Sequence, residues 1–126
     1  MKLKVFASAL MTGSSVALAN GSYPKNTIRI IAPFAPGGSV DILARLVSAP
    51  LGKELNTPVV VENKPGASGQ IGAAYVARSK PDGYTLLANS SIHVITPSLF
   101  ENSPYDAIED FIPVSQITNV PLVLLT

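Results

Sequence analysis

Short β-branched runs alternate with stretches of helical periodicity along this chain. Residues 28–32, 58–62 and 84–88 are compact apolar runs of the kind that form buried strands. Between them, apolar residues recur at helical spacing over residues 39–55, and residues 71–79 form an alanine-rich segment that predicts a short second helix. The order strand–helix–strand–helix–strand predicts an α/β fold with parallel strands joined by right-handed helical crossovers.

The first predicted helix carries signals at its start and near its end. Ser39 is its predicted N-cap, and Asp41 falls in the first turn, where the helix dipole favours a negative side chain. Pro50 has no N–H to donate within the helix, so we expect a kink or an early end there. The predicted apolar face comprises Ile42, Leu43, Leu46, Val47, Leu51 and Leu55.

Beyond the third predicted strand the pattern is less regular. Residues 92–100 are predicted to be helical as far as Pro97 allows, and residues 103–106 predict a turn. Two further apolar stretches, residues 111–118 and 121–125, favour strands or extended crossings. Because the second stretch runs to the last residue without a turn, we expect the protein to continue beyond this sequence.

The first residues have the pattern of an export signal. Lys2 and Lys4 form a short basic region, residues 5–18 are mostly apolar or small, and residues 17–19 read Ala-Leu-Ala, as a signal peptidase requires. Thr12-Gly13-Ser14-Ser15 interrupts the apolar run, which is shorter than the roughly 20 residues of a membrane span. We therefore expect residues 1–19 to be a signal peptide that is cleaved near Ala19, and the mature protein to be periplasmic.

Charge and cysteine usage exclude several classes of function. Without the predicted signal peptide, seven basic residues stand against eight acidic ones, which leaves no electrostatic footprint for nucleic acid. The chain has no cysteine, so thiol nucleophiles, thiolate metal sites and disulfides are excluded. A single histidine, His93, excludes a multi-histidine metal site. We expect no metal and no cofactor.

Three loops follow the three predicted strands and are rich in glycine, serine and asparagine. They are residues 34–41, 63–70 and 89–91. In an open parallel sheet, ligands bind at the carboxyl ends of the strands, where free N–H groups at helix starts form anion sites. The alternative is that the glycines only make turns. Three such loops at one edge of the sheet favour a pocket for a small anion.

For Asp41 two roles are possible, and each of three aromatic residues has one expected role. Asp41 either complements its helix dipole or faces the pocket and selects a hydroxyl or ammonium group of the ligand. Phe34 is expected to form a wall of the pocket, whereas Tyr84 and Phe111 are expected in the core.

Signatures of catalysis and of nucleotide binding are missing from the sequence. Residues 66–72 read G-x-x-G-x-x-G, which differs from the dinucleotide fingerprint G-x-G-x-x-G. Ser39, Ser90 and Ser91 lack the G-x-S-x-G elbow of hydrolases. His93 has no nucleophile at motif spacing, so we interpret it as a hydrogen-bonded structural residue. The sequence therefore indicates a protein that is not an enzyme.

Several ordered motifs resemble one family of receptors. Residues 28–41 read IRIIAPFAPGGSVD and residues 59–69 read VVVENKPGASG; both closely resemble the Bordetella uptake gene (Bug) family, the substrate-binding receptors of tripartite tricarboxylate transporters. The match begins at Tyr23-Pro24 and continues in order through residues 81–87, 104–106 and 110–115. Pro50 departs from the family's unbroken helix pattern.

The resemblance implies a type II periplasmic-binding-protein-like fold, with two lobes that close around the ligand. Each lobe has a parallel or mixed sheet flanked by helices. Only part of that fold would be present here. Residues 20–118 would form the first segment of lobe 1, and residues 119–126 would begin the crossing toward the second lobe.

The function implied is capture of a small carboxylate, with no catalytic step. The ligand would be a di- or tricarboxylate, an aromatic acid or an amino acid, held partly through ordered water. Membrane permease subunits would be transient partners of a receptor that is a monomer when intact. An exported sensor receptor of the same fold, or an exported α/β enzyme, are the alternatives. Carried over to this chain, the ligand-binding residues are Phe34, Pro36, Gly37, Gly38, Asp41, Ala67, Gly69, Ser90 and Ser91.

Overall fold

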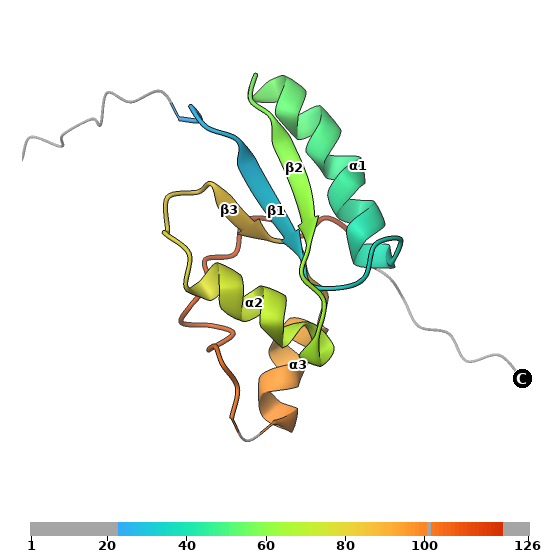
Figure 1. The fold of residues 1–126 in the computed structure, drawn as a ribbon, viewed down its shortest axis with the longest axis vertical. Helices are drawn as coiled ribbons and strands as arrows, with labels where there is room; N and C mark the ends of the chain where they lie inside the picture. The colour runs from blue at the N-terminus through green and yellow to red at the C-terminus, as the bar shows by residue number, and fades with distance from the viewer. Residues whose placement is uncertain (1–22, 101, 120–126) are drawn as a thin grey trace, which may run out of the picture.

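A three-stranded parallel sheet organises the computed structural model, which describes residues 23–100 and 102–119 (Figure 1). The strands are β1 (Ile28–Ala32), β2 (Val59–Asn63) and β3 (Thr85–Leu87), in the spatial order β2–β1–β3. Both pairings of β1 are parallel, with Ile30 opposite Val61 on one side and Leu86 on the other. The predicted α/β fold and its parallel strands are confirmed.

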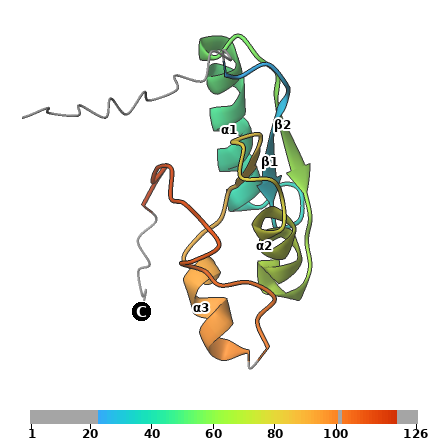
Figure 2. The same ribbon diagram turned by 90° about the vertical axis from the view of Figure 1, so that its left-hand side faces the viewer.

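Helices cover the two faces of this sheet. They are α1 (Ser39–Glu54), the short 3₁₀ helix η1 (Ala67–Gly69), α2 (Gln70–Ala77) and α3 (Ile92–Leu99). Asn63 bonds to a side chain of α1, while the preceding residue Glu62 pairs with Arg29 on the side where Tyr75 of α2 lies. Because successive strand residues point to opposite faces, α1 and α2 lie on opposite sides of the sheet. In both views α3 lies beyond α2 (Figures 1 and 2).

The first helix begins one residue from the predicted cap. Gly38 has the extended backbone of an N-cap and Ser39 is already helical, with no side-chain cap bond. The expected early end at Pro50 is wrong, because α1 continues to Glu54. A proline inside a helix removes its own N–H bond and crowds the carbonyl four residues earlier, but here the following turn still packs on β2, where a Cβ placed on Gly52 would lie 3.7 Å from the Val59 side chain.

The apolar face predicted for α1 is only partly buried. Ile42 and Leu46 are 49% and 65% exposed, while Asp41 and Ala44 are the buried residues of the helix. α1 packs closely on the sheet and turns small and polar side chains toward it. The larger apolar side chains therefore lie at the flanks of the helix.

Beyond β3 the chain is held by one small core cluster. Tyr105 is buried against Ala73 and Ala74 of α2, with Leu87 and Phe111 packed at the margin. Phe111 is therefore half-buried rather than a full core residue, and the same holds for Tyr84, whose hydroxyl accepts the N–H of Lys25.

The C-terminal predictions had mixed outcomes. α3 extends two residues past Pro97, and the turn expected at 103–106 instead occupies residues 107–110. Residues 111–119 form no strand and are largely exposed, with Ile112 at 88%. Of the two alternatives expected over 111–118, a strand or an extended crossing, the strand is wrong, since among the described residues no neighbouring strand pairs with this segment.

Two predictions lie outside the described residues. These are the signal peptide, residues 1–19, and the apolar run 121–125; of the expected crossing, residues 119–126, only residue 119 is described. Among the helices that the structure describes, none has the length and apolar character needed to cross a bilayer.

Candidate functional site

The loops after β1 and β2 touch each other at the carboxyl edge of the sheet. A Cβ placed on Gly69 would lie 3.4 Å from the ring of Phe34, and one on Gly72 would lie 2.7 Å from Cβ of Pro33. The start of α2 therefore packs directly on the loop that follows β1. Gly72 is needed for this approach, because a Cβ there would be too close to Pro33 and would separate the two segments, whereas Gly69 is favoured by its left-handed φ of +90°.

The second loop has an uncommon backbone. Gly66, Ala67, Ser68 and Gly69 all have positive φ, of 130°, 47°, 54° and 90°. For Ala67 and Ser68 this conformation costs on the order of 1–2 kcal/mol each, because Cβ crowds the backbone. In the described part of the chain, the N–H groups of these two residues have no acceptor, whereas Gly69 donates to the Gly66 carbonyl at 3.0 Å. Successive free N–H groups in such a turn form an anion-binding concavity.

Asp41 is almost fully buried, with 3% of its surface exposed. Its Oδ2 accepts the N–H of Gly37 at 2.9 Å, and its Oδ1 accepts Nδ2 of Asn63 at 2.9 Å. Arg45, one turn further along α1, donates Nε to both carboxylate oxygens at 3.0 and 3.1 Å. The carboxylate is thus surrounded by donors of the protein itself.

The same contacts explain the ionisation of Asp41. Its pKa lies well below the ordinary value because the hydrogen bond from Arg45, the Gly37 N–H and the Asn63 amide all favour the charged form, and they outweigh its burial. Asp41 is therefore a carboxylate over the whole physiological pH range.

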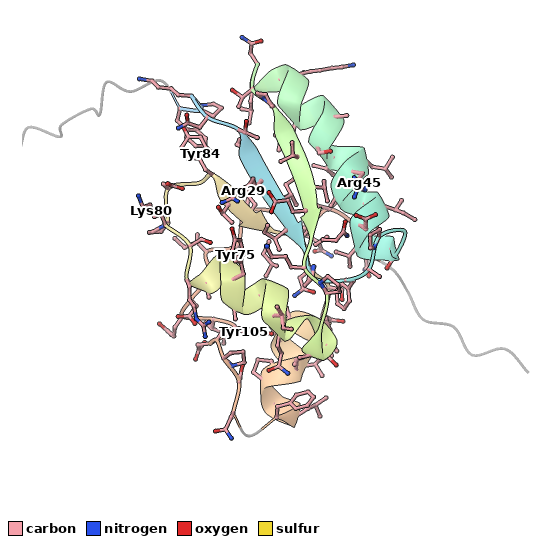
Figure 3. The ribbon with its side chains drawn as sticks, in the orientation of Figure 1. Arg29, Arg45, Tyr75, Lys80, Tyr84 and Tyr105 are labelled. Atoms are coloured by element: carbon pink, nitrogen blue, oxygen red, sulfur yellow. The ribbon has the colours of Figure 1, made fainter. Side chains whose placement is uncertain are left out.

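Asn63, the last residue of β2, connects the two loops. Its Nδ2 donates to Asp41 and also to the carbonyl of Phe34 at 3.1 Å, while its Oδ1 accepts Nη2 of Arg45 at 3.1 Å. Arg45 lies on α1 alongside β2 (Figure 3). Sequence reasoning missed both residues as site candidates. The Asp–Arg spacing of four on a predicted helix was the available signal for Arg45.

Some N–H groups of the first loop donate to other groups of the protein, and others are left free for a ligand. Gly37 donates to Asp41, and Gly38 donates to the Ala35 carbonyl at 3.3 Å. The first helical N–H groups of α1, from Ser39 and Val40, have no intrahelical acceptor by helix geometry. The N–H of Asp41 is left unpaired in the same way, since the first helical bond runs from Ile42 to the Gly38 carbonyl at 2.9 Å, so the N–H groups of Ser39 and Val40 are among those available to a ligand.

The third loop is less closely integrated. Ser90 and Ser91 are exposed, and the Ser90 N–H bonds the neighbouring Asn89 side chain at 2.9 Å. The helix that this loop starts, α3, packs against η1. The structure therefore brings together Phe34, Gly37, Gly38, Asp41 and Gly69, with Pro36 and Ala67 exposed on the same two loops. Ser90 and Ser91 reach them only through α3.

His93 has aromatic neighbours. Its ring stacks on Tyr105 at a centroid distance of 5.2 Å and meets the edge of Phe111 at 4.6 Å. Burial lowers its pKa, opposed by a hydrogen bond to the backbone of Ala107. These contacts fit the structural role predicted for it. Within the described residues, no group of histidine and acidic side chains could hold a metal ion.

Comparisons with known proteins identify the relatives of this chain. The model of the tripartite tricarboxylate transporter family receptor matches residues 43–126. Protein BugT of Bordetella pertussis is 44% identical over 116 residues, which cover 90% of this chain and 36% of BugT. The chain thus spans about a third of the length of the curated relatives that it matches.

Solved structures agree with that assignment. The periplasmic binding protein BugD is 40% identical with a TM-score of 0.68, over 71% of this chain and 30% of BugD. MatC from Rhodopseudomonas palustris, solved with bound malate, is 39% identical with a TM-score of 0.69, over 73% of this chain and 32% of MatC. Another R. palustris protein, solved with adipate, is 35% identical with a TM-score of 0.64, over 68% of this chain and 29% of that protein.

The predicted resemblance and the periplasmic-binding-protein-like fold, present in part, are therefore confirmed. The motifs of the two glycine loops, their placement at one edge of a parallel sheet, and the match over residues 43–126 lead to one conclusion. This chain belongs to the tripartite tricarboxylate transporter receptor family.

Proposed function

We propose that this chain is the first part of an extracytoplasmic receptor that captures a small carboxylate and delivers it to the permease subunits of a transporter. The observation that carries the proposal is the convergence of two donor-bearing loops at one sheet edge: the free N–H groups of Ala67 and Ser68 lie on the loop that packs against Pro33 and Phe34, at the beginning of the loop that leads to α1. Solved relatives hold malate and adipate, which are both dicarboxylates.

Binding would use backbone groups rather than charged side chains. The N–H groups of Ser39 and Val40 stand at the positive end of the α1 dipole, and those of Ala67 and Ser68 would bind the same ligand from the second loop. Phe34 supplies an apolar wall next to these donors, and ordered water would complete the contacts. Closure of a second lobe would exclude bulk water and strengthen each bond.

The proposal extends to processing and location. Residues 1–19 would direct export to the periplasm and be removed near Ala19, residues 20–118 would form the first segment of lobe 1, and residues 119–126 would lead toward lobe 2. The receptor would act as a monomer, without a catalytic step, and would contact the permease only transiently.

The test is a thermal-shift screen of the complete receptor, expressed from the reading frame that contains this sequence. Probes are malate, adipate, citrate, benzoate and glutamate, each with its uncharged amide as control. A ligand at 100 times its Kd adds about 2.7 kcal/mol of stability, which moves the Tm clearly. A shift with an acid and none with its amide supports the proposal. No shift with any of the acids contradicts it.

A matched pair of variants tests the donors in the same screen. Ser39→Pro removes one N–H at the first helical position, where proline fits the helix, while Ser39→Ala keeps the N–H and removes only the hydroxyl. A lost hydrogen bond to a charged ligand costs about 1.5–3 kcal/mol, or roughly tenfold to a hundredfold in Kd. We expect that loss for Ser39→Pro alone; equal affinities of the two variants would remove Ser39 from the proposed site.

A further inference from the structure

We propose that Asp41, Asn63 and Arg45 form a positioning clamp that holds the two glycine loops in one fixed relation, so that their donors meet the same ligand. The inference rests on the proposed function and deepens it. In this view Asp41 does not contact the ligand, and it does more than complement its own helix.

The reach of Asp41 across the loops is the first argument. One carboxylate oxygen accepts the N–H of Gly37 in the loop after β1, at 2.9 Å. The other accepts Nδ2 of Asn63, which lies 22 residues away at the end of β2, at 2.9 Å. An aspartate that only complemented the helix dipole would need neither contact. A single buried group therefore fixes both loops.

The position of Asn63 is the second argument. It is the last residue of β2 and lies opposite Ala32, the last residue of β1, so both loops leave the sheet beside it. Its amide has two N–H groups and one oxygen, and all three are used, by Asp41, Phe34 and Arg45. A fully bonded amide on a strand end is a rigid attachment point for the loops that follow.

Charge is the third argument. A buried carboxylate beside a site for an anion would repel the ligand. Arg45 neutralises it at 3.0 Å while its own side chain remains 52% exposed, so the clamp carries no net charge. Burial of Asp41 and occupation of both its oxygens by protein donors also leave no acceptor for a ligand hydroxyl or ammonium group.

Hydrogen exchange of the complete receptor tests the clamp without any ligand. Asp41→Asn keeps the shape but places amide hydrogens against donors. We expect amide exchange at least tenfold faster in both segments, 34–41 and 63–70, with the strands unchanged. Ile28→Val, a buried change at the opposite end of β1 that lowers stability away from the loops, is the matched control and should not accelerate these segments selectively. Faster exchange in 34–41 alone would overturn the proposal, because Asp41 would then serve only its own loop.

Affinity gives the second readout, with malate and adipate as probes. Asp41→Asn and Asn63→Ala should each weaken binding at least tenfold, whereas Glu54→Gln, which removes one exposed charge from the same helix, and Ile28→Val should leave Kd within twofold. Unchanged affinity in both clamp variants would overturn the positioning role. If the wild-type receptor binds neither acid, the choice of ligand in the proposed function fails, and the exchange experiment still decides whether the clamp exists.

Discussion

At the scale of single residues, Gly72 and Gly37 are glycines for different physical reasons. A Cβ on Gly72 would lie 2.7 Å from Cβ of Pro33 and 2.9 Å from the carbonyl oxygen of Lys64. A Cβ on Gly37 would meet nothing within 4 Å, but the φ of Gly37 is +83°. The first position excludes a side chain by contact, and the second disfavours one by backbone conformation.

Gly72→Ala is therefore expected to lower the free energy of unfolding by about 1–3 kcal/mol, because α2 must move away from backbone atoms that cannot yield. Chemical denaturation of the complete receptor measures this loss. The ring of Phe34 and the strained turn would shift with α2, so ligand affinity should fall as well.

Gly37→Ala is the matched control for that substitution. It should cost about 1 kcal/mol, the usual penalty for a left-handed alanine, and leave α2 in place. If Gly72→Ala is as stable as the wild type, the close packing of α2 on the first loop is refuted.

The residue scale also shows what the sequence could and could not reveal. Glycine and proline act on their own backbone, so the positions of the two loops were predictable. The role of Asn63 depends on the register that places it opposite Ala32, and Arg45 matters only because Asp41 faces inward. The spacing of four signals an Asp41–Arg45 pair, but neither the strand register nor the inward direction of Asp41 is encoded locally, which is why both residues were missed.

At the scale of elements, Pro50 is an exposed proline inside a continuous helix. It leaves one carbonyl without its helical partner, and proline in a helix interior costs roughly 3 kcal/mol relative to alanine. Replacement also frees the unfolded chain, which offsets up to about 1 kcal/mol. We expect Pro50→Ala to raise the free energy of unfolding by on the order of 1–2 kcal/mol, as measured by denaturant titration.

Pro81→Ala provides the comparison for Pro50→Ala. Pro81 is exposed in a bend outside any helix, so its replacement only frees the unfolded chain and should lower stability by roughly 0.4–1 kcal/mol. Opposite signs for the two variants support the account. If Pro50→Ala instead lowered the free energy of unfolding relative to the wild type, Pro50 would be shown to stabilise the native protein.

Element boundaries were predictable where periodicity and turn residues agreed. β1 and β2 were found within one residue, because both are short apolar runs closed by proline or glycine. The buried face of α1 was not predictable from periodicity. Close approach to the sheet selects small residues such as Ala44 on that face and leaves Leu46 exposed. Of the strand or extended crossing expected over 111–118, the strand does not form, because hydrophobicity alone does not supply a pairing partner.

At the scale of the whole molecule, stability should depend on pH in two separate ranges. Burial against aromatic rings lowers the pKa of His93, so in mildly acidic solution the unfolded chain binds a proton that the native protein does not. The free energy of unfolding then falls as pH decreases below about 6.5, the ordinary pKa of histidine.

The second range belongs to carboxylates. The pKa of Asp41 is lowered mainly by Arg45, and the pKa of Asp106 by the backbone N–H groups of Glu109 and Ile108. Both carboxylates are ionised in the native protein below the pH at which they protonate in the unfolded chain. Their contribution to stability is present above about pH 4 and is lost as pH falls further.

Urea unfolding of the complete receptor between pH 8 and pH 3 separates these ranges, using the difference between wild type and variant at each pH. His93→Phe keeps a ring against Tyr105 and removes the titration, so its stability relative to wild type should increase as the pH falls below about 6.5 and become constant once the native histidine is also protonated. Asp106→Asn should differ from wild type above pH 4 and converge with it in stronger acid. A His93→Phe difference that stays constant from pH 7 to pH 5 would show that His93 titrates alike in both states, and the aromatic cluster around it would then not exclude the charged ring.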